Sequence, residues 1–453
     1  MTYRELLSGN ADFRRLWTGQ AVSEVGDWLN NIAVLALAIQ LAGPGSVGLA
    51  VATYAIARHL PLFLFGPVAG VVVDRVSRRR VMIAADLARA GLALGFLLAN
   101  RFGSLALIYF VGASLFSVSA FFNAAKRASI PNLVGSTDEL LAANSLSAST
   151  TAATIAVGSA LGGVVATALG RDAVFVLNAF TFLASAEMIR RIEGSRQTAV
   201  GSTLRVADVE SLPRSSQREG FRLPTAICLL PTVLRRVASD FTEGLRYVRR
   251  DRVLAAVFVV AGGWGLGNGA ARALYSLFGA SLGEQAAGRW GASVRAVAER
   301  PTDFGISVLF VAMGLGGVLG APLARRINRG AVEGLGARMG RSLALDGCGL
   351  LLFSLTPNLF GAAALLVARE MNFAIWWTAQ QTLLMRRTED AFAGRVFASY
   401  ETLTTLTMVG SIFVSGAAAD RLGMRAVAAG GGTVIMLSGL LWFVLRRRRG
   451  ETA

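Results

Sequence analysis

Long apolar segments separated by short polar ones run through most of this chain. A helix needs about 20 apolar residues to cross the hydrocarbon core of a bilayer. We predict transmembrane helices in twelve segments, of which the ninth is the shortest: residues 16–41, 47–73, 81–99, 105–125, 140–169, 173–189, 254–282, 304–323, 343–355, 359–384, 392–419 and 426–445. Only 16% of the residues are charged, against about 25% in soluble proteins. The pattern therefore predicts an all-α polytopic membrane protein.

One long polar interruption divides the twelve segments into two sets of six. Its first part is rich in Ser, Arg and Gln, a composition typical of disorder. Residues 237–247 have the spacing of an amphipathic helix that lies along a membrane surface. We predict an N-terminal six-helix lobe (1–192), a cytoplasmic linker with this amphipathic helix (193–251) and a C-terminal six-helix lobe (252–453), the organisation of a two-lobed transporter.

The charge pattern predicts the topology. The net charge is +17, and the basic residues gather in alternate connections, at residues 75–80, 126–127, 325–341, 386–395 and 446–449. Short loops rich in Lys and Arg stay in the cytoplasm, so we predict cytoplasmic termini and a location in the plasma (inner) membrane. The outer connection 283–303 departs from the alternation because it carries three arginines. The basic loops suit contact with anionic lipid, and they lack the interleaved aromatics of a nucleic-acid site.

The connection after the second segment is the most distinctive one. It reads Gly-Val-Val-Val-Asp-Arg-Val-Ser-Arg-Arg-Arg at residues 70–80. Its arginines alone are equally consistent with an anchor at the lipid headgroups. Asp74 is a single carboxylate among them, and we predict that it is a conformational switch: it would bind the N-terminal end of the helix at 392–419 in one of two transport states. Arg75 and Arg78 would hold Asp74 in place.

This connection also carries a family resemblance. Gly70-x-x-x-Asp74-Arg75-x-x-Arg78-Arg79 resembles the loop between the second and third helices of the major facilitator superfamily, with Ser77 where that family usually has glycine. Residues 240–254 and the Gly-Arg-Val-Phe at 394–397 resemble its enterobactin-exporter and macrolide-efflux branch. The resemblance implies export of a small organic molecule driven by the proton gradient.

A glycine motif in the fifth segment has two interpretations. Gly158-x-x-x-Gly162-Gly163 resembles the Gly-Pro-x-x-Gly-Gly signature of drug/proton antiporters in the same family, with Ser159 in place of proline. Close packing of helices through small residues would produce the same spacing.

Polar residues form a stripe on the first segment. Gln20, Glu24, Asp27 and Asn31 share one helical face. Because a polar stripe cannot face lipid, we expect it to line a central cavity, although a structural hydrogen-bond network is the alternative. Arg58 in the second segment is placed to pair with Asp27. His59, the only histidine, is either a packing residue or a proton carrier.

Further ionisable residues lie inside other segments, where they are functional candidates by default. Asp86 and Arg89 are three residues apart, and we expect them to neutralise each other. Arg369 and Glu370 lie in the tenth segment and Glu401 in the eleventh.

The resemblance implies a functional arginine in the fourth segment, yet residues 105–123 are uncharged. Arg369 with Glu401 is a possible substitute. Our candidates for proton coupling are the acids of the apolar segments, Glu24, Asp27, Glu370 and Glu401.

Aromatic residues such as Trp28, Phe121 and Phe122 suit either a cavity wall or helix packing. We find no Walker A loop, no zinc motif of the His-Glu-x-x-His type and no nucleophile elbow in the sequence. We therefore expect no enzyme activity, cofactor or metal, and a monomer. The hypothesis is a proton-coupled secondary active exporter of a siderophore or drug-like molecule. An uptake transporter, a lipid or lysolipid mover and a non-transporting sensor are the alternatives.

Overall fold

The computed structural model describes the whole chain except residues 1, 194–238, 240, 291–298, 329–333 and 448–453. Its described part is helical, and a further helical stretch lies at residues 241–248. The named helices are α1 (Tyr3–Gly9), α2 (Ala11–Leu41), α3 (Val47–Arg75), α4 (Arg78–Phe102), α5 (Leu105–Leu133), α6 (Thr137–Leu169), α7 (Arg171–Arg190), α10 (Arg252–Trp290), α12 (Pro301–Asn328), α13 (Leu335–Leu355), α14 (Leu359–Arg387), α15 (Asp390–Leu422) and α16 (Met424–Arg447).

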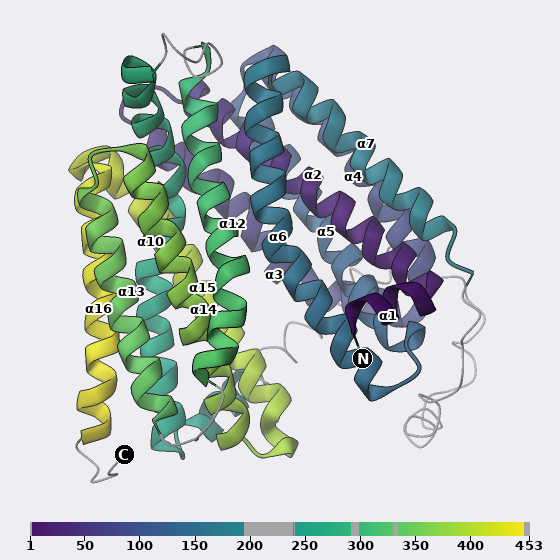
Figure 1. Ribbon diagram of the computed structural model, residues 1–453, viewed down its shortest axis with the longest axis vertical. Coiled ribbons are helices and arrows are strands. Elements are labelled where there is room, and N and C mark those ends of the chain that lie inside the picture. Colours follow the sequence, from purple (N-terminus) through teal and green to yellow (C-terminus); the bar gives the residue numbers. More distant parts are fainter. Residues whose placement is uncertain (1, 194–238, 240, 291–298, 329–333, 448–453) are drawn as a thin grey trace.

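The long helices form two bundles (Figure 1). In the first bundle, α2 packs against α6 and α7, and α5 packs against α3 and α4. In the second, α10 packs against α12, α15 and α16, and α14 packs against α12 and α13. This arrangement confirms the predicted all-helical fold. Most of the linker predicted at 193–251 lies outside the described residues.

Eleven of the described helices are long and apolar enough to cross a membrane. The remaining predicted span corresponds to α13, which has three charged residues, Arg338, Arg341 and Asp346, among its 21 residues. Because α13 packs against α14 and α16 inside the second bundle, we assign it as the twelfth span.

Several helices extend beyond the predicted spans. α5 continues to Leu133, α10 continues to Trp290, and α13 begins at Leu335. Hydropathy marks the part of a helix that lies in lipid, whereas a helix ends where its backbone groups find a cap. Lys and Arg are good helix formers, so a charge does not end a helix. The predicted loop residues Lys126 and Arg127 consequently lie within α5.

The short helix α1 was not predicted. Thr2 Oγ1 accepts a hydrogen bond from the Glu5 N–H at 3.3 Å, and the Thr2 N–H donates to Glu5 Oε2 at 2.8 Å. This reciprocal pair is a capping box, whose Thr-x-x-Glu signature is visible in the sequence. Leu6 is fully buried and anchors α1 to the first bundle.

The two bundles meet at the end opposite the chain termini. There the Asp420 carboxylate at the end of α15 accepts hydrogen bonds from the Gly48 and Leu49 N–H groups, at 2.7 and 2.9 Å, at the start of α3. Arg171 of α7 forms a bidentate ion pair with Asp303 of α12, with N–O distances of 3.0 and 2.8 Å. Towards the other end the bundles spread apart (Figure 1). At that end no hydrogen bond or ion pair joins the two bundles among the residues described.

The glycine motif of α6 lies at close helix contacts. A Cβ atom on Gly158 would come within 2.6 Å of the Val25 carbonyl oxygen of α2. One on Gly162 would come within 2.9 Å of Leu29 Cα. A Cβ on Gly163 would come within 2.5 Å of Ser307 Cβ, on α12 of the other bundle. This geometry supports the packing interpretation of the motif.

The Gly162→Ala variant should therefore destabilise the protein. The added methyl group meets backbone atoms of Leu29 that cannot rotate away, and overpacking of this kind costs about 1–3 kcal/mol. Thermal unfolding of the detergent-solubilised protein would measure the change as a lower midpoint. Gly91→Ala is the matched control, because nothing lies within 4 Å of the Cβ position of Gly91 in α4. Equal midpoints for the two variants would contradict the packing role.

The helical stretch at 241–248 overlaps the predicted amphipathic helix, of which residues 237, 238 and 240 lie outside the described part. It packs on the first turns of α15. Glu243 pairs with Arg395 at 3.2 Å, and the Tyr247 ring stacks on Phe392 with centroids 4.6 Å apart. Its described contacts are thus with a helix of the second bundle.

Candidate functional site

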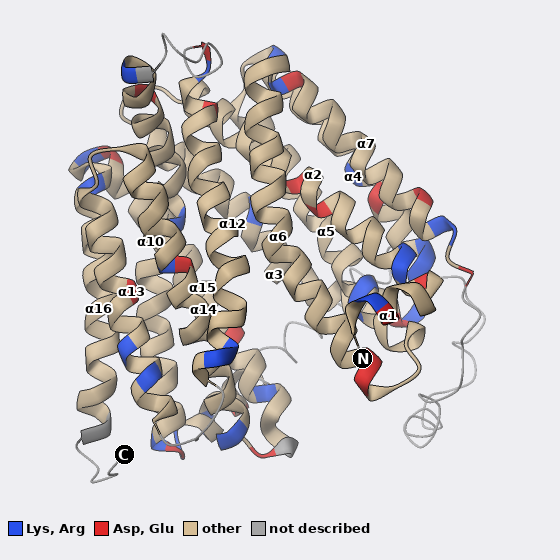
Figure 2. Ribbon diagram, in the orientation of Figure 1, with Lys and Arg blue, Asp and Glu red and all other residues tan. Residues whose placement is uncertain are grey.

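Charged residues are concentrated at the ends of the bundles, and a smaller set lies within the helices (Figure 2). Ionisable groups within a membrane-spanning bundle are costly and mark functional sites by default. The interior set falls into four places: a cluster around Glu24, one ion-pair group in each of the two bundles, and a cavity where the bundles meet.

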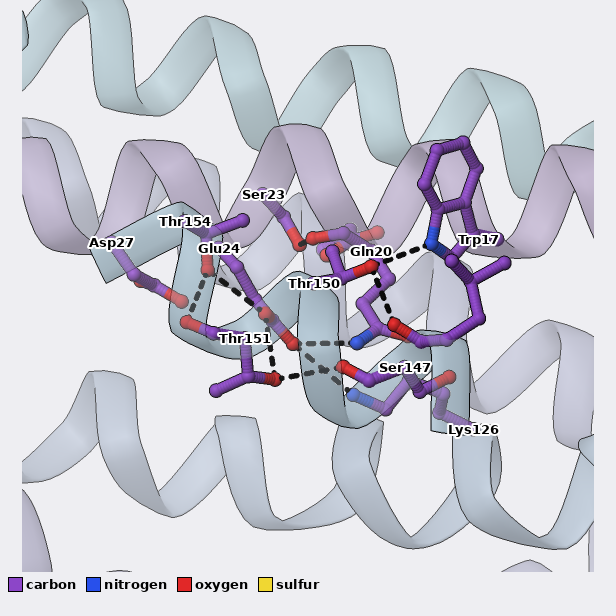
Figure 3. Close-up of polar contacts among 12 residues, drawn as sticks. Trp17, Gln20, Ser23, Glu24, Asp27, Lys126, Ser147, Thr150, Thr151 and Thr154 are labelled. Carbon is purple, nitrogen blue, oxygen red and sulfur yellow. Dashed lines mark hydrogen bonds and ion pairs between the residues drawn. The ribbon is translucent and has the colours of Figure 1, made fainter. Parts of the chain in front are cut away.

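Glu24 is the centre of the first cluster, shown in Figure 3. Its Oε1 atom accepts a hydrogen bond from Gln20 Nε2 at 2.8 Å and lies 3.4 Å from the ammonium nitrogen of Lys126. Its Oε2 atom accepts from the hydroxyls of Thr151 and Thr154, at 3.1 and 3.2 Å. All these partners are donors, and one of them is cationic. The carboxylate of Glu24 therefore lies among hydrogen-bond donors from α2, α5 and α6.

Lys126 was not among the predicted site residues. Its position directly after the predicted span 105–125 suggested a loop, but it lies on α5 with its side chain 12% exposed. A basic residue within a turn or two of a predicted span end can belong to the same helix. The fourth span therefore contains a cation after all, which the prediction had placed outside the span.

The second group joins Asp27, Asp86 and Arg89. Arg89 is paired with Asp86, as the spacing predicted, and its Nη1 atom lies 3.9 Å from Asp27 Oδ2. The Arg89 guanidinium packs between two rings, 4.1 Å from the centroid of Phe122 and 4.5 Å from that of Phe182. Asp27 thus pairs with Arg89, and not with Arg58 as the sequence had suggested.

Arg58 instead contacts residues of α2 and α5. It donates a hydrogen bond to Asn31 Oδ1 at 2.5 Å. Its guanidinium carbon lies 4.6 Å from the ring centroid of Trp28 and 4.9 Å from that of Phe116. The neighbouring His59 donates from Nδ1 to the Ala55 carbonyl oxygen at 2.8 Å.

These residues line a cavity of about 240 Å³ between the bundles, to which α2, α3, α5, α10 and α12 contribute. Two of the predicted cavity-lining residues, Trp28 and Asn31, belong to its wall. Gln20, Phe121 and Phe122 do not: Gln20 is bonded to Glu24, and Phe122 packs on Arg89. The polar stripe on α2 thus divides between a hydrogen-bond network and the cavity wall.

The second bundle has its own buried ion pair. Arg369 contacts Asp346, with both interatomic distances at 3.0 Å, and donates to the hydroxyl of Tyr275 and, at 3.2 Å, to Asn268 Oδ1. Both charged side chains are 3% exposed or less. Asp86 and Asp346 both lie on the third spanning helix of their bundles, but Asp86 pairs with Arg89 on the same helix, whereas Asp346 pairs with Arg369 on α14.

The other two candidate acids of the second bundle have different surroundings. Glu370 is half-buried and interacts electrostatically with Arg369 and Arg272. Glu401 is exposed on α15, and its carboxylate has no hydrogen-bond or ion-pair partner among the described residues. The substitute pair of Arg369 with Glu401 is therefore not formed.

The motif at 70–80 lies at the end of the first bundle where the bundles are apart. Asp74 is exposed and, in the described part of the chain, has no hydrogen-bond or ion-pair partner. Arg78 donates to the Ala128 carbonyl oxygen at 2.6 Å, and Arg79 donates to the Arg190 carbonyl oxygen. Arg78 and Arg79 thus bind carbonyl groups near the ends of α5 and α7. Contrary to the expectation from the sequence, neither Arg75 nor Arg78 contacts the Asp74 carboxylate among the described residues.

Two relatives are similar over part of their length. The chain is 30% identical over 176 residues to the Uncharacterized MFS-type transporter YfiS of Bacillus subtilis (strain 168), which is 38% of this chain and 40% of that protein. It is 35% identical over 75 residues to Macrolide efflux protein A of Streptococcus pyogenes, which is 17% of this chain and 18% of that protein. The chain thus spans less than half the length of either relative.

Two broader comparisons cover nearly the whole chain. A crystal structure of the nucleoside transporter NupG is similar with a TM-score of 0.59, covering 96% of this chain and 99% of that one at 12% identity. At this identity the likeness shows the fold alone. The family described as the Major Facilitator Superfamily matches residues 16–409. The resemblance carried by the motif at 70–80 is thus confirmed, and the chain belongs to the major facilitator superfamily.

Proposed function

We propose that this transporter is a proton-coupled exporter of a small organic molecule, of siderophore or drug-like type, and that it works by alternating access in the plasma (inner) membrane. The observation that carries the proposal is the Glu24 cluster, in which a carboxylate and an ammonium lie together inside the first bundle. The similarity to a macrolide efflux protein supports export.

The cluster offers a way to couple a proton to a structural change. Ionised Glu24 attracts Lys126, whereas protonated Glu24 would not, so binding a proton would release the ammonium on α5. Asp27, one helical turn along α2, provides a second carboxylate near a cation, Arg89. Proton occupancy of these groups would then bias the equilibrium between two arrangements of the bundles.

Transport into sealed liposomes tests this proposal. The purified protein would be reconstituted into liposomes, and candidate siderophores or drugs would be added outside them. Uptake into the liposomes would be measured with and without an imposed pH gradient. Accumulation that follows the gradient in the export direction supports the proposal. Substrate movement only in the uptake direction would favour the uptake alternative, and movement of lipid analogues alone would favour a lipid mover. Absence of transport for every compound would leave the sensor alternative.

The same proposal also predicts the side of the membrane to which the described conformation opens. With cytoplasmic termini, bundles that are apart at the terminal end form a state open to the cytoplasm. Asp74 is unpartnered in this state, and contact with the start of α15 would require the bundles to close at that end. A carboxylate gains about 0.3–1 kcal/mol at an exposed helix N-terminus. Asp74 would therefore favour the outward-open state.

Asp74→Asn should shift the population towards the arrangement described here and slow transport. Spin labels at the C-terminal end of α3 and the N-terminal end of α15 would report this shift as a larger fraction of long label-to-label distances. Asp138→Asn is a matched control, because Asp138 is an exposed acid near the same end of the first bundle. A distance distribution identical to that of the unmodified protein would remove the switch role.

A further inference from the structure

The wall of the cavity between the bundles carries positive charge. Arg58 and Arg272, one from each bundle, are among its lining residues, and no Asp or Glu is found among them in the described part of the chain. Asn31, which accepts a hydrogen bond from Arg58, is neutral. The cavity wall therefore presents two cations of like sign at the place where the bundles meet.

Neither arginine is neutralised by a direct ion pair. Arg58 has five N–H donors, of which Asn31 accepts one. Within the described residues, Arg272 has no hydrogen bond or ion pair, although it interacts electrostatically with Glu370 outside the cavity wall. Arg58 likewise interacts electrostatically with Asp27 without a direct ion pair. Charges without a direct partner in a membrane protein are costly and mark functional sites. A concave site lined by one sign of charge concentrates ligands of the opposite sign.

The rest of the wall is largely aromatic. The Arg58 guanidinium lies against Trp28 and Phe116, which fixes its orientation. Trp28 of the first bundle packs beside Phe310 of the second, with centroids 6.0 Å apart and ring planes tilted by 46°. Aromatic lining residues of this kind can contact a ligand ring by offset stacking or edge to face. A cavity of roughly 150 Å³ accommodates benzene, so the 240 Å³ here suits a ligand of about two fused rings.

We propose that this cavity is the substrate site and that it selects organic anions with an aromatic ring, held by Arg58 and Arg272. The inference deepens the proposed transport function and rests on it. Arg–carboxylate contacts are short and directional, so a carboxylate attached to the ring satisfies both the charge and the apolar wall. Because the arginines come from different bundles, the bound anion also links the bundles.

Binding to the purified full-length protein tests this selectivity without any gradient. The probe is radiolabelled 2-naphthoate at neutral pH, and 2-naphthamide and 2-naphthylmethylammonium are competitors with the same rings. We expect 2-naphthoate to bind at least tenfold more tightly than the amide, and the ammonium compound not to compete. The comparison uses the unmodified protein, so it stands even if a variant fails to fold.

Variants then assign the effect to the two residues. Arg58→Gln and Arg272→Gln should each weaken 2-naphthoate binding at least tenfold, and Arg58→Lys and Arg272→Lys should restore part of it. Arg101→Gln, an exposed arginine at the far end of α4, should bind as the unmodified protein does. If Arg272 serves only to balance Glu370, Arg272→Gln will leave 2-naphthoate binding unchanged.

Three results would overturn the inference: no 2-naphthoate binding up to millimolar concentration, equal binding of the amide or ammonium compound, or unchanged affinity in either glutamine variant. The assay involves neither a proton gradient nor a direction of transport. Failure of proton coupling would therefore leave its outcome intact, and preference for the cation would overturn the anion site while leaving the proposed export standing.

Discussion

Replacing Arg369 by glutamine is expected to lower the free energy of unfolding by about 3–5 kcal/mol, the usual cost of leaving one member of a buried ion pair without its partner. In Arg369→Gln, the carboxylate of Asp346 would stay in the second bundle with its side chain 2% exposed. The hydrogen bonds from Arg369 to Tyr275 and Asn268 would be lost as well. Denaturant titration of the solubilised protein would measure the change.

Removing both charges should recover most of this loss, because the double variant Asp346→Asn with Arg369→Gln leaves no unpaired buried charge. Arg190→Gln is the matched control, since Arg190 forms its ion pair with Glu187 on an exposed surface. A double variant as unstable as the single one would show that the pair does not act as a unit. An unaffected single variant would contradict the prediction directly.

Glutamine in place of Glu24 should reduce proton-driven substrate accumulation at least tenfold. The amide still accepts hydrogen bonds from Thr151 and Thr154, but it cannot bind and release a proton, and it leaves Lys126 without its counter-charge. Substrate exchange at equal pH on both sides should continue, because exchange requires no net proton movement. Liposome assays under the two conditions would separate coupling from binding.

The Glu187→Gln variant controls for the chemical change, as Glu187 lies in a surface ion pair of the same bundle. Full gradient-driven accumulation by Glu24→Gln would remove Glu24 from the coupling mechanism. Asp27→Asn, Glu370→Gln and Glu401→Gln complete the series. If all four variants accumulate substrate normally, the proposal of proton coupling through these acids fails.

The sequence by itself determined the helical membrane architecture and the family. Segment length is set by bilayer thickness, so apolar runs marked the spans without reference to their neighbours. The motif at 70–80, together with the layout of two sets of six spans, carried the resemblance to the family. The ion pair of Asp86 with Arg89 was also predictable, because residues three apart on one helix meet whatever surrounds them. The capping box of Thr2 and Glu5 was equally local, although it was overlooked.

Only the tertiary structure decided which charges meet between helices. The rotation of each helix about its axis is set by packing, at contacts such as Gly162 on Leu29, and hydropathy does not encode it. Arg89 therefore reaches Asp27, and Lys126 reaches Glu24 from a helix that extends past its apolar run. Arg58 and Arg272 are 214 residues apart in sequence. They line one cavity because the packing of the two bundles brings them together.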